Sequence, residues 1–198
     1  MKKALRILII VIILVALVVF YYWFLSNRTN ARTESAKEEE KVTELNDILL
    51  MDLNADYPKT PRAVMKLYNR IITLYYNEEL SDTELRQLFG QQRNLYDAEL
   101  LAANPEETAF SALQLEVAGY GETKLLRTEI SDSEDIQYTD IEEGSDTWEC
   151  AYVNSSYFTM ENATYSQTYM QYCMRKDSEG KWKIVAYYTI DKVEDDDD

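Results

Sequence analysis

Two cysteines, Cys150 and Cys173, are the residues of this sequence whose types and spacing bear most directly on chemistry. Each lies in a segment rich in Tyr, Thr and Val, which predicts two neighbouring strands joined by a turn within residues 160–163. A two-residue turn centred on Glu161 and Asn162 would place the two cysteines directly opposite each other. Outside the cytoplasm the pair could form a cross-strand disulfide. The alternative is two free thiols buried in the core.

The chain contains no histidine, and this removes several kinds of catalytic and metal site. Neither a Ser/His/Asp triad nor a Cys/His pair can form, although a lysine or an aspartate could still act as a base. Two cysteines without a CxxC spacing or a histidine do not supply the four ligands of a zinc site. The sequence also has no P-loop, GxGxxG or EF-hand pattern, so we predict no catalytic residue, no cofactor and no metal site.

Tyrosine is the most conspicuous side chain, with 16 copies in the chain. Several tyrosines lie on the apolar stripe of a predicted helix or in predicted strands, where their rings and hydroxyls could line a pocket for a small ligand. The alternative is ordinary core packing, because tyrosine favours strands. The candidate pocket residues are Tyr68, Tyr75, Tyr152, Tyr169 and Tyr187.

The chain is strongly acidic, with 36 Asp and Glu against 20 Lys and Arg and a formal net charge of −16. Binding to a phosphate backbone requires compensating basic residues, so we predict no nucleic-acid partner. Residues 193–198 end in an acidic run, which predicts a solvated tail.

Residues 7–25 form an uncharged apolar run that follows Lys2, Lys3 and Arg6. At about 1.5 Å per helical residue, this run is long enough to cross a hydrocarbon core of about 30 Å. The aromatic cluster Tyr21–Phe24 near its end is typical of a membrane interface rather than of a signal-peptide cleavage site. We therefore expect a transmembrane helix, with a cleaved signal peptide as the alternative.

The positive charges before the predicted span favour an N-terminus in the cytoplasm, which places the rest of the chain outside the cell membrane. The polar segment after the span predicts a short spacer, and the remaining length fits one domain. We thus predict a single-pass protein with a cytoplasmic tail at residues 1–6, a transmembrane helix at 7–25, a polar spacer at 26–37, an extracytoplasmic domain at 38–192 and an acidic tail at 193–198.

Apolar residues at three- and four-residue steps predict three to four helices in the first part of the domain. Start signals support them: Thr60 with Pro61, the capping box of Ser81 with Glu84, and Pro105. The helical patterns cover residues 38–53, 61–75, 82–95 and 106–117.

After Gly121 the apolar period changes to two, which predicts four antiparallel strands. Residues 177–180 contain a glycine between the last two and predict their turn. The strand patterns cover residues 126–130, 148–157, 164–175 and 181–190. Helices followed by strands indicate an α+β fold, with helices packed on one face of a curved sheet.

The last predicted hairpin covers residues 177–190 and contains the segment 179–184 (EGKWKI). This hairpin, with the order of helices and strands, resembles the nuclear transport factor 2-like superfamily. With residues 56–62 (DYPKTPR) included, the chain also resembles uncharacterised single-pass membrane proteins of Gram-positive bacteria over residues 40–192. The resemblance implies a cone-shaped α+β fold and a membrane location, but no reaction. Enzymes of the superfamily often use an Asp with a His or Tyr in the cone, and this chain has no His.

These observations favour a membrane-anchored, extracytoplasmic, non-catalytic binding or scaffolding domain whose partners are other membrane or envelope proteins. The alternative is a small-molecule-binding or isomerase-like protein with a ligand in the cone, which requires a buried carboxylate of raised pKa beside a tyrosine. A third hypothesis is a purely structural role, which self-association of Glu38–Leu53 would support.

Overall fold

A computed structural model of the chain describes residues 44–143 and 146–191. The chain divides into two compact units, Met1–Asn46 and Asp47–Asp198. The described residues of the first unit, 44–46, are helical. The second unit contains the sheet and the helices α2 to α5.

The predicted inner tail, transmembrane helix and spacer lie outside the described residues, as does the acidic tail. Within residues 44–143 and 146–191, no helix is both long enough and apolar enough to cross a membrane.

The helices begin where the sequence predicts caps. In α2 (Pro61–Asn77) the Thr60 hydroxyl accepts a hydrogen bond from the Ala63 backbone N–H at 3.1 Å, and Pro61 occupies the first turn. In α3 (Asp82–Arg93) Ser81 and Glu84 form the expected capping box. The last helix, α5 (Glu106–Tyr120), ends at Gly121, whose φ of 55° suits a residue without a Cβ.

The strands form one antiparallel sheet around the long hairpin of β3 (Asp146–Glu161) and β4 (Thr164–Lys176). The last strand, β5 (Trp182–Ile190), pairs with β4. On its other edge, β3 pairs with β1 (Lys124–Ile130) along one half and with β2 (Gln137–Glu143) along the other. Register shifts in the β1–β3 and β4–β5 pairs are bulges, which bend a sheet.

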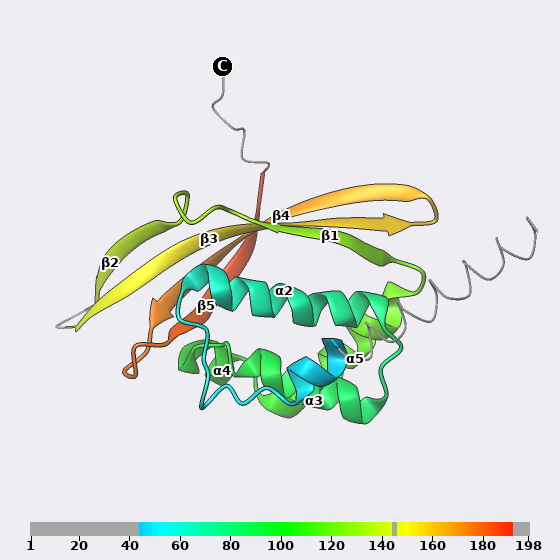
Figure 1. Cartoon of the computed structure of the whole chain (residues 1–198), viewed down its shortest axis with the longest axis horizontal. Helices are drawn as coiled ribbons and strands as arrows, with labels where there is room; N and C mark the ends of the chain where they lie inside the picture. Colours follow the sequence, from blue (N-terminus) through cyan, green and yellow to red (C-terminus); the bar gives the residue numbers. More distant parts are fainter. Residues whose placement is uncertain (1–43, 144–145, 192–198) are drawn as a thin grey trace, which may run out of the picture. The chain divides into compact units, whose positions relative to one another are not determined.

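Helices cover one face of the sheet (Figure 1), and α2 lies along β1 with α3 and α5 on its far side. The core lies between α2 and the sheet. From the helices it contains Val64, Met65, Ile71 and Leu88, and from the strands Ala151, Val153, Met174 and Ile184, all completely buried. The α+β prediction with an antiparallel sheet is therefore confirmed.

The prediction of four strands is wrong, because the sheet has five. The missed strand is β2, and every side chain described within it, from residue 137 to 142, is exposed. A strand with neither face buried has no alternation of apolar and polar residues, so its sequence carries no period-two signal.

Two helix predictions also need correction. The helix expected to run to Leu53 ends at residue 49, and the Asp52 carboxylate instead accepts hydrogen bonds from the backbone N–H groups of Asn54 and Ala55 in a turn. A short helix, α4 (Ala98–Ala103), was not predicted. It begins at an Asp97 cap but buries no residue, so its sequence lacks an apolar stripe.

Candidate functional site

The predicted register of the two cysteines is wrong by two residues. Cys150 pairs with Arg175, and Cys173 pairs with Tyr152, so the cysteines are diagonal neighbours on one sheet face and both are free thiols. A shift of two residues keeps every side chain on the same face, so the apolar pattern could not reveal it.

Turn chemistry decides this register. The two turn residues are Asn162 and Ala163, with φ of 47° and 62°, rather than Glu161 and Asn162. Both positions of the favoured two-residue turn require positive φ, which asparagine adopts more readily than most residues. Burial raises the pKa of both Cys150 and Cys173, which lowers the fraction of reactive thiolate.

The five candidate pocket tyrosines do not share one face of the sheet. Tyr68 and Tyr75 of α2 are buried against the sheet, and Tyr187 of β5 lies 5.7 Å from the ring of buried Tyr172. Tyr152 alternates with buried Ala151 and Val153, and Tyr169 pairs opposite Ser156, so both lie on the other face. The strands of the sheet therefore separate this set into two groups.

On the helix-covered face, buried tyrosines belong to a chain of hydrogen bonds. The Tyr157 hydroxyl donates to Asn69 Oδ1 at 2.8 Å and lies 2.6 Å from the Tyr172 hydroxyl. Asn69 Nδ2 donates to Ser155 Oγ at 3.0 Å, and that hydroxyl donates to the Glu129 carbonyl of β1 at 2.8 Å. These groups satisfy one another across the core.

A second part of the network joins α2 to α3. The Tyr75 hydroxyl donates to Gln92 Oε1 at 3.0 Å, and Gln92 Nε2 donates to the Tyr96 hydroxyl at 2.7 Å. Within the described part of the chain, every buried side-chain nitrogen and oxygen has a hydrogen-bond partner. The polar side chains of the described interior therefore bond protein groups.

The buried hydroxyls are neutral at ordinary pH. Burial raises the pKa of Tyr157 to about 12, and burial also raises the pKa of Tyr68, Tyr75 and Tyr172. They can therefore donate hydrogen bonds but cannot act as bases near neutral pH.

Asp97 is the buried carboxylate of the described residues, and its environment does not suit a general base. Burial alone would raise its pKa, but hydrogen bonds from Arg175 and from the Glu99 backbone N–H outweigh burial and lower it. Arg175 binds Asp97 with two nitrogens, at 2.7 and 2.9 Å. Across the described residues, no group of three or more cysteines and carboxylates is placed to hold a metal ion.

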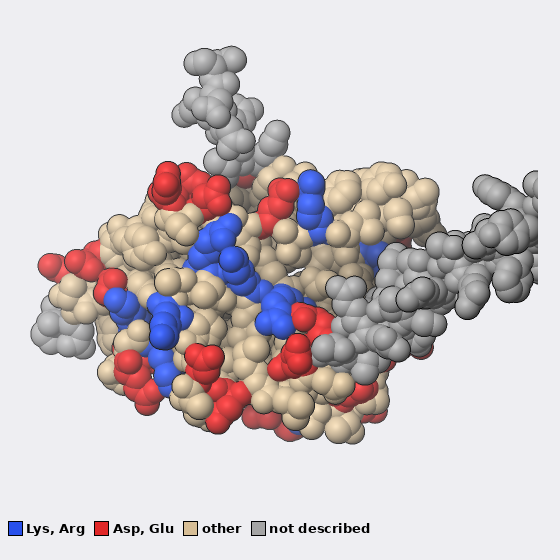
Figure 2. Space-filling model, in the orientation of Figure 1, with Lys and Arg blue, Asp and Glu red and all other residues tan. Residues whose placement is uncertain are grey.

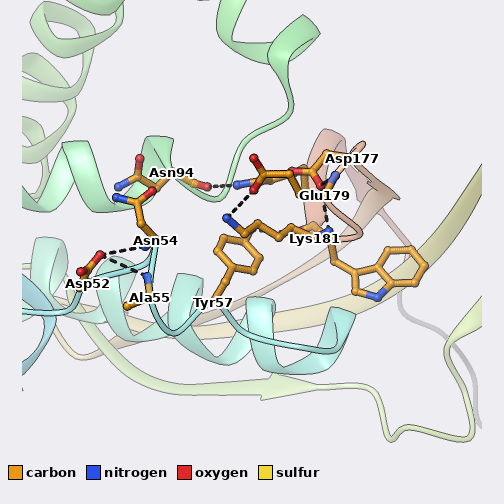
Figure 3. Close-up of polar contacts among 10 residues, drawn as sticks. Asp52, Asn54, Ala55, Tyr57, Asn94, Asp177, Glu179 and Lys181 are labelled. Carbon is orange, nitrogen blue, oxygen red and sulfur yellow. Dashed lines mark hydrogen bonds and ion pairs between the residues drawn. The ribbon is translucent and has the colours of Figure 1, made fainter.

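The two segments that carry the family resemblance lie against each other (Figure 3). The Tyr57 hydroxyl donates to the Trp182 carbonyl at 2.8 Å, and Lys183 Nζ lies 4.2 Å from the centre of the Tyr57 ring. Lys183 Nζ also donates to the Asn94 carbonyl at 2.7 Å. These contacts attach the segment before α2 to β5. The residues that carry the resemblance therefore have a structural role in packing.

An open groove of about 500 Å³ lies between α2 and β1. Helix α2 contributes Arg62, Lys66, Asn69, Arg70 and Thr73, and strand β1 contributes Thr128, Glu129 and Ile130. In Figure 2, Lys and Arg side chains form a band on the face of the molecule where α2 lies in Figure 1. This basic groove contrasts with the net charge of −16.

Hydrogen bonds at both ends of the groove hold α2 and β1 side by side. Near the start of α2, Arg62 Nε donates to the Ser131 carbonyl at 3.0 Å, just after β1 ends. At the end of α2, the Asn77 amide bonds both the N–H and the C=O of Leu125, near the start of β1. The helix and the strand therefore run in opposite directions along the groove.

The charged residues that line the groove are three cations, Arg62, Lys66 and Arg70, and one carboxylate, Glu129. Arg62 also forms an ion pair with Asp132 at 3.3 Å. Lys66 is exposed and has no ion pair with a residue that the structure describes. The Glu129 carboxylate is paired with Arg127 at 3.2 Å, which reduces its effect on the groove. The positive side chains of the groove therefore suit an anionic group.

The sequence-based predictions missed this groove. Its signal was present as Arg62, Lys66 and Arg70, spaced four residues apart in an acidic chain. Residues at this spacing lie on one face of a helix, here the face opposite the buried stripe. The contribution of β1 could not be seen, because it depends on how the strand packs beside α2.

Comparison with known proteins places the chain in a family rather than with a characterised relative. No curated protein matches the chain. A family described as a domain of unknown function, DUF6715, matches residues 1–187. Because this match covers most of the 198 residues, the chain belongs to the DUF6715 family.

Proposed function

We propose that this protein is a membrane-anchored, extracytoplasmic, non-catalytic binding or scaffolding domain. Its binding site is the α2–β1 groove, and its partner is an anionic part of another membrane or envelope protein. The observation that carries the proposal is the line of Arg62, Lys66 and Arg70 along an open groove in an acidic chain. Such a patch attracts negative groups and sets the orientation of the partner.

The hydrogen bonds among the buried polar groups support the non-catalytic part of the proposal. The tyrosine hydroxyls are bonded to protein groups, and the buried carboxylate, Asp97, is held ionised by Arg175. The isomerase-like alternative needs a carboxylate of raised pKa beside a tyrosine, and Asp97 has a lowered pKa. Helices on one face of a bent antiparallel sheet support the nuclear transport factor 2-like fold that the resemblance implies.

The membrane location rests on residues 7–25 and the basic residues before them. We expect the full chain to stay with membranes after alkaline carbonate extraction. Introducing charges by Leu14→Arg and Leu17→Arg should release it, because each charge in a span costs about 2.5–3.5 kcal/mol. Release of the unchanged chain by carbonate would reject the anchor.

Photo-crosslinking of the full chain in its native membranes tests the groove. A photoreactive phenylalanine analogue replaces Thr73, which lines the groove, and in a matched control it replaces Tyr165, which is exposed outside it. We expect one discrete adduct from position 73 that Lys66→Glu abolishes, and no such adduct from position 165. The same adducts from both positions, or an adduct insensitive to Lys66→Glu, would reject the groove as the binding site.

A further inference from the structure

We propose that the α2–β1 groove takes an extended acidic peptide segment, which adds as a strand to the outer edge of β1 at Thr128 and Ile130. This inference rests on the proposed function and specifies the form of the partner and its mode of binding. Three properties of the groove support it: the direction of the backbone groups of β1, the way the ends of this edge are covered, and the spacing of the cations.

The backbone of β1 has polar groups that face away from the sheet. The Ser131 N–H donates to the Asn154 carbonyl at 2.9 Å, and the Ser155 hydroxyl donates to the Glu129 carbonyl, so these groups face β3. Backbone groups of successive residues alternate between the two sides of an antiparallel strand. Thr128 and Ile130 therefore present their N–H and C=O groups to the groove.

Side chains of Asn77 and Arg62 cover the two ends of this edge. Asn77 bonds both backbone groups of Leu125, at 3.0 and 2.8 Å, as a neighbouring strand would. At the other end, Arg62 bonds the Ser131 carbonyl. Among the hydrogen bonds of the described residues, no side chain or loop covers the outward groups of Thr128 or Ile130. Proteins normally cover or block exposed strand edges, so an open stretch lining a groove suits strand addition.

The cations are spaced to match alternate residues of an added strand. Lys66 follows Arg62 by four residues, and Arg70 follows Lys66 by four, so successive cations are about 6 Å apart along α2. Alternate residues of a strand point to the same face and are about 6.6 Å apart. A strand paired with β1 and carrying carboxylates at alternate positions would place one near each cation. The intervening residues would face away from α2.

This geometry separates strand addition from simple attraction of charge. A continuous acidic run places half of its carboxylates on the wrong face and has low strand propensity. A peptide of alternating glutamate and valine has the favoured pattern. We therefore expect the alternating peptide to bind more tightly than a peptide of the same composition in two blocks.

The test measures binding of these two synthetic peptides to the full chain in detergent micelles by fluorescence anisotropy. We expect the alternating peptide to bind at least about tenfold more tightly than the block peptide. Methylating the alternating peptide's backbone nitrogens that would face β1 should abolish binding, because those N–H groups are its donors to the strand. Equal binding by the methylated and unmethylated peptides would overturn strand addition.

Protein variants locate the site. Lys66→Glu should weaken binding of the alternating peptide about tenfold, whereas Lys124→Glu, the same charge change on β1 outside the groove lining, should leave it unchanged. Thr128→Pro removes an outward N–H without removing a bond to β3, so it should abolish binding. Chemical unfolding of each variant shows whether it is folded, and unchanged binding by a folded Thr128→Pro chain would overturn the inference.

The two proposals fail in different ways. If the peptides do not bind, or bind without regard to pattern, while the crosslink from position 73 still depends on Lys66, the groove binds an anion of another form and only strand addition is rejected. If the crosslink also lacks this dependence, the proposed function is rejected as well.

Discussion

The tyrosine network and the α2–β1 groove lie on two sides of the same helix, and their polar groups have different uses. In the network, the hydroxyls of Tyr75, Tyr157 and Tyr172 bond other protein groups, and Tyr75 and Tyr172 are buried. In the groove, Lys66 is exposed, and Thr128 and Ile130 of β1 line the opposite wall. A satisfied buried group contributes to stability, whereas an unsatisfied exposed group is available to another molecule.

Asn69 is the connection between the two regions. Its side chain is buried and joins Tyr157 to Ser155 in the network, yet the residue also lines the groove. The hydrogen-bond chain continues from Ser155 to the carbonyl of Glu129 in β1. The core network thus positions the strand whose edge forms one wall of the groove.

The largest expected effect on stability comes from removing a tyrosine of the network. Tyr172→Ala removes a buried ring and the partner of the Tyr157 hydroxyl, so we expect a loss of about 3–5 kcal/mol in the free energy of unfolding. Urea unfolding of the full chain, followed by tryptophan fluorescence, measures this loss. Tyr165→Ala is the control, because Tyr165 is exposed, and it should cost less than about 1 kcal/mol. Similar losses of stability in both variants would show that Tyr172 is not buried as described.

Alkaline pH should weaken the tyrosine network. Because the folded pKa of Tyr157 is raised from 10.0 to about 12, its contribution to stability is complete below pH 10. The contribution is lost as pH rises from 10 to about 12, since the unfolded chain releases the proton first. Urea unfolding across this pH range measures the slope of stability against pH, and Tyr157→Phe should make it shallower. An unchanged slope in Tyr157→Phe would contradict the raised pKa.

A smaller effect is expected at the connection between the regions. Asn69→Ala leaves the Ser155 and Tyr157 hydroxyls each without one partner, so we expect a loss of about 1–3 kcal/mol. The urea unfolding curve gives the magnitude. Thr73→Ala is a matched control on the same helix, because the Thr73 hydroxyl donates a hydrogen bond to the Asn69 carbonyl within α2. A larger loss of stability for Thr73→Ala than for Asn69→Ala would show that Asn69 does not connect the network to β1.

The smallest effect on stability is expected in the groove. Lys66→Glu changes an exposed side chain without an ion pair among the described residues, so the free energy of unfolding should change by less than about 0.5 kcal/mol. The same variant is expected to bind the alternating acidic peptide about tenfold more weakly, so binding and stability measurements distinguish the two regions. A large loss of stability would assign Lys66 to the structure rather than to binding.

Elements with local sequence signals were predictable from the amino-acid sequence. Thr60, Pro61 and the Ser81 capping box begin α2 and α3 as predicted, because a cap depends on residues three positions away. The turn at residues 177–180 is also present, with Gly180 at a φ of 76°. The α+β class followed from the change of apolar period after Gly121.

Features that depend on residues far apart in the sequence were not predictable without the tertiary structure. A shift of two residues in the pairing of the strands of Cys150 and Cys173 leaves the same side chains on each face, so the apolar pattern does not fix their register. Strand β2 buries neither face, so its sequence carries no periodic signal. The basic residues of α2 were visible in the sequence, but they become a groove only where β1 lies beside the helix. The physical reason is that caps and turns are set by bonds between near neighbours. A groove is set by which surfaces of distant segments remain uncovered after the core has packed.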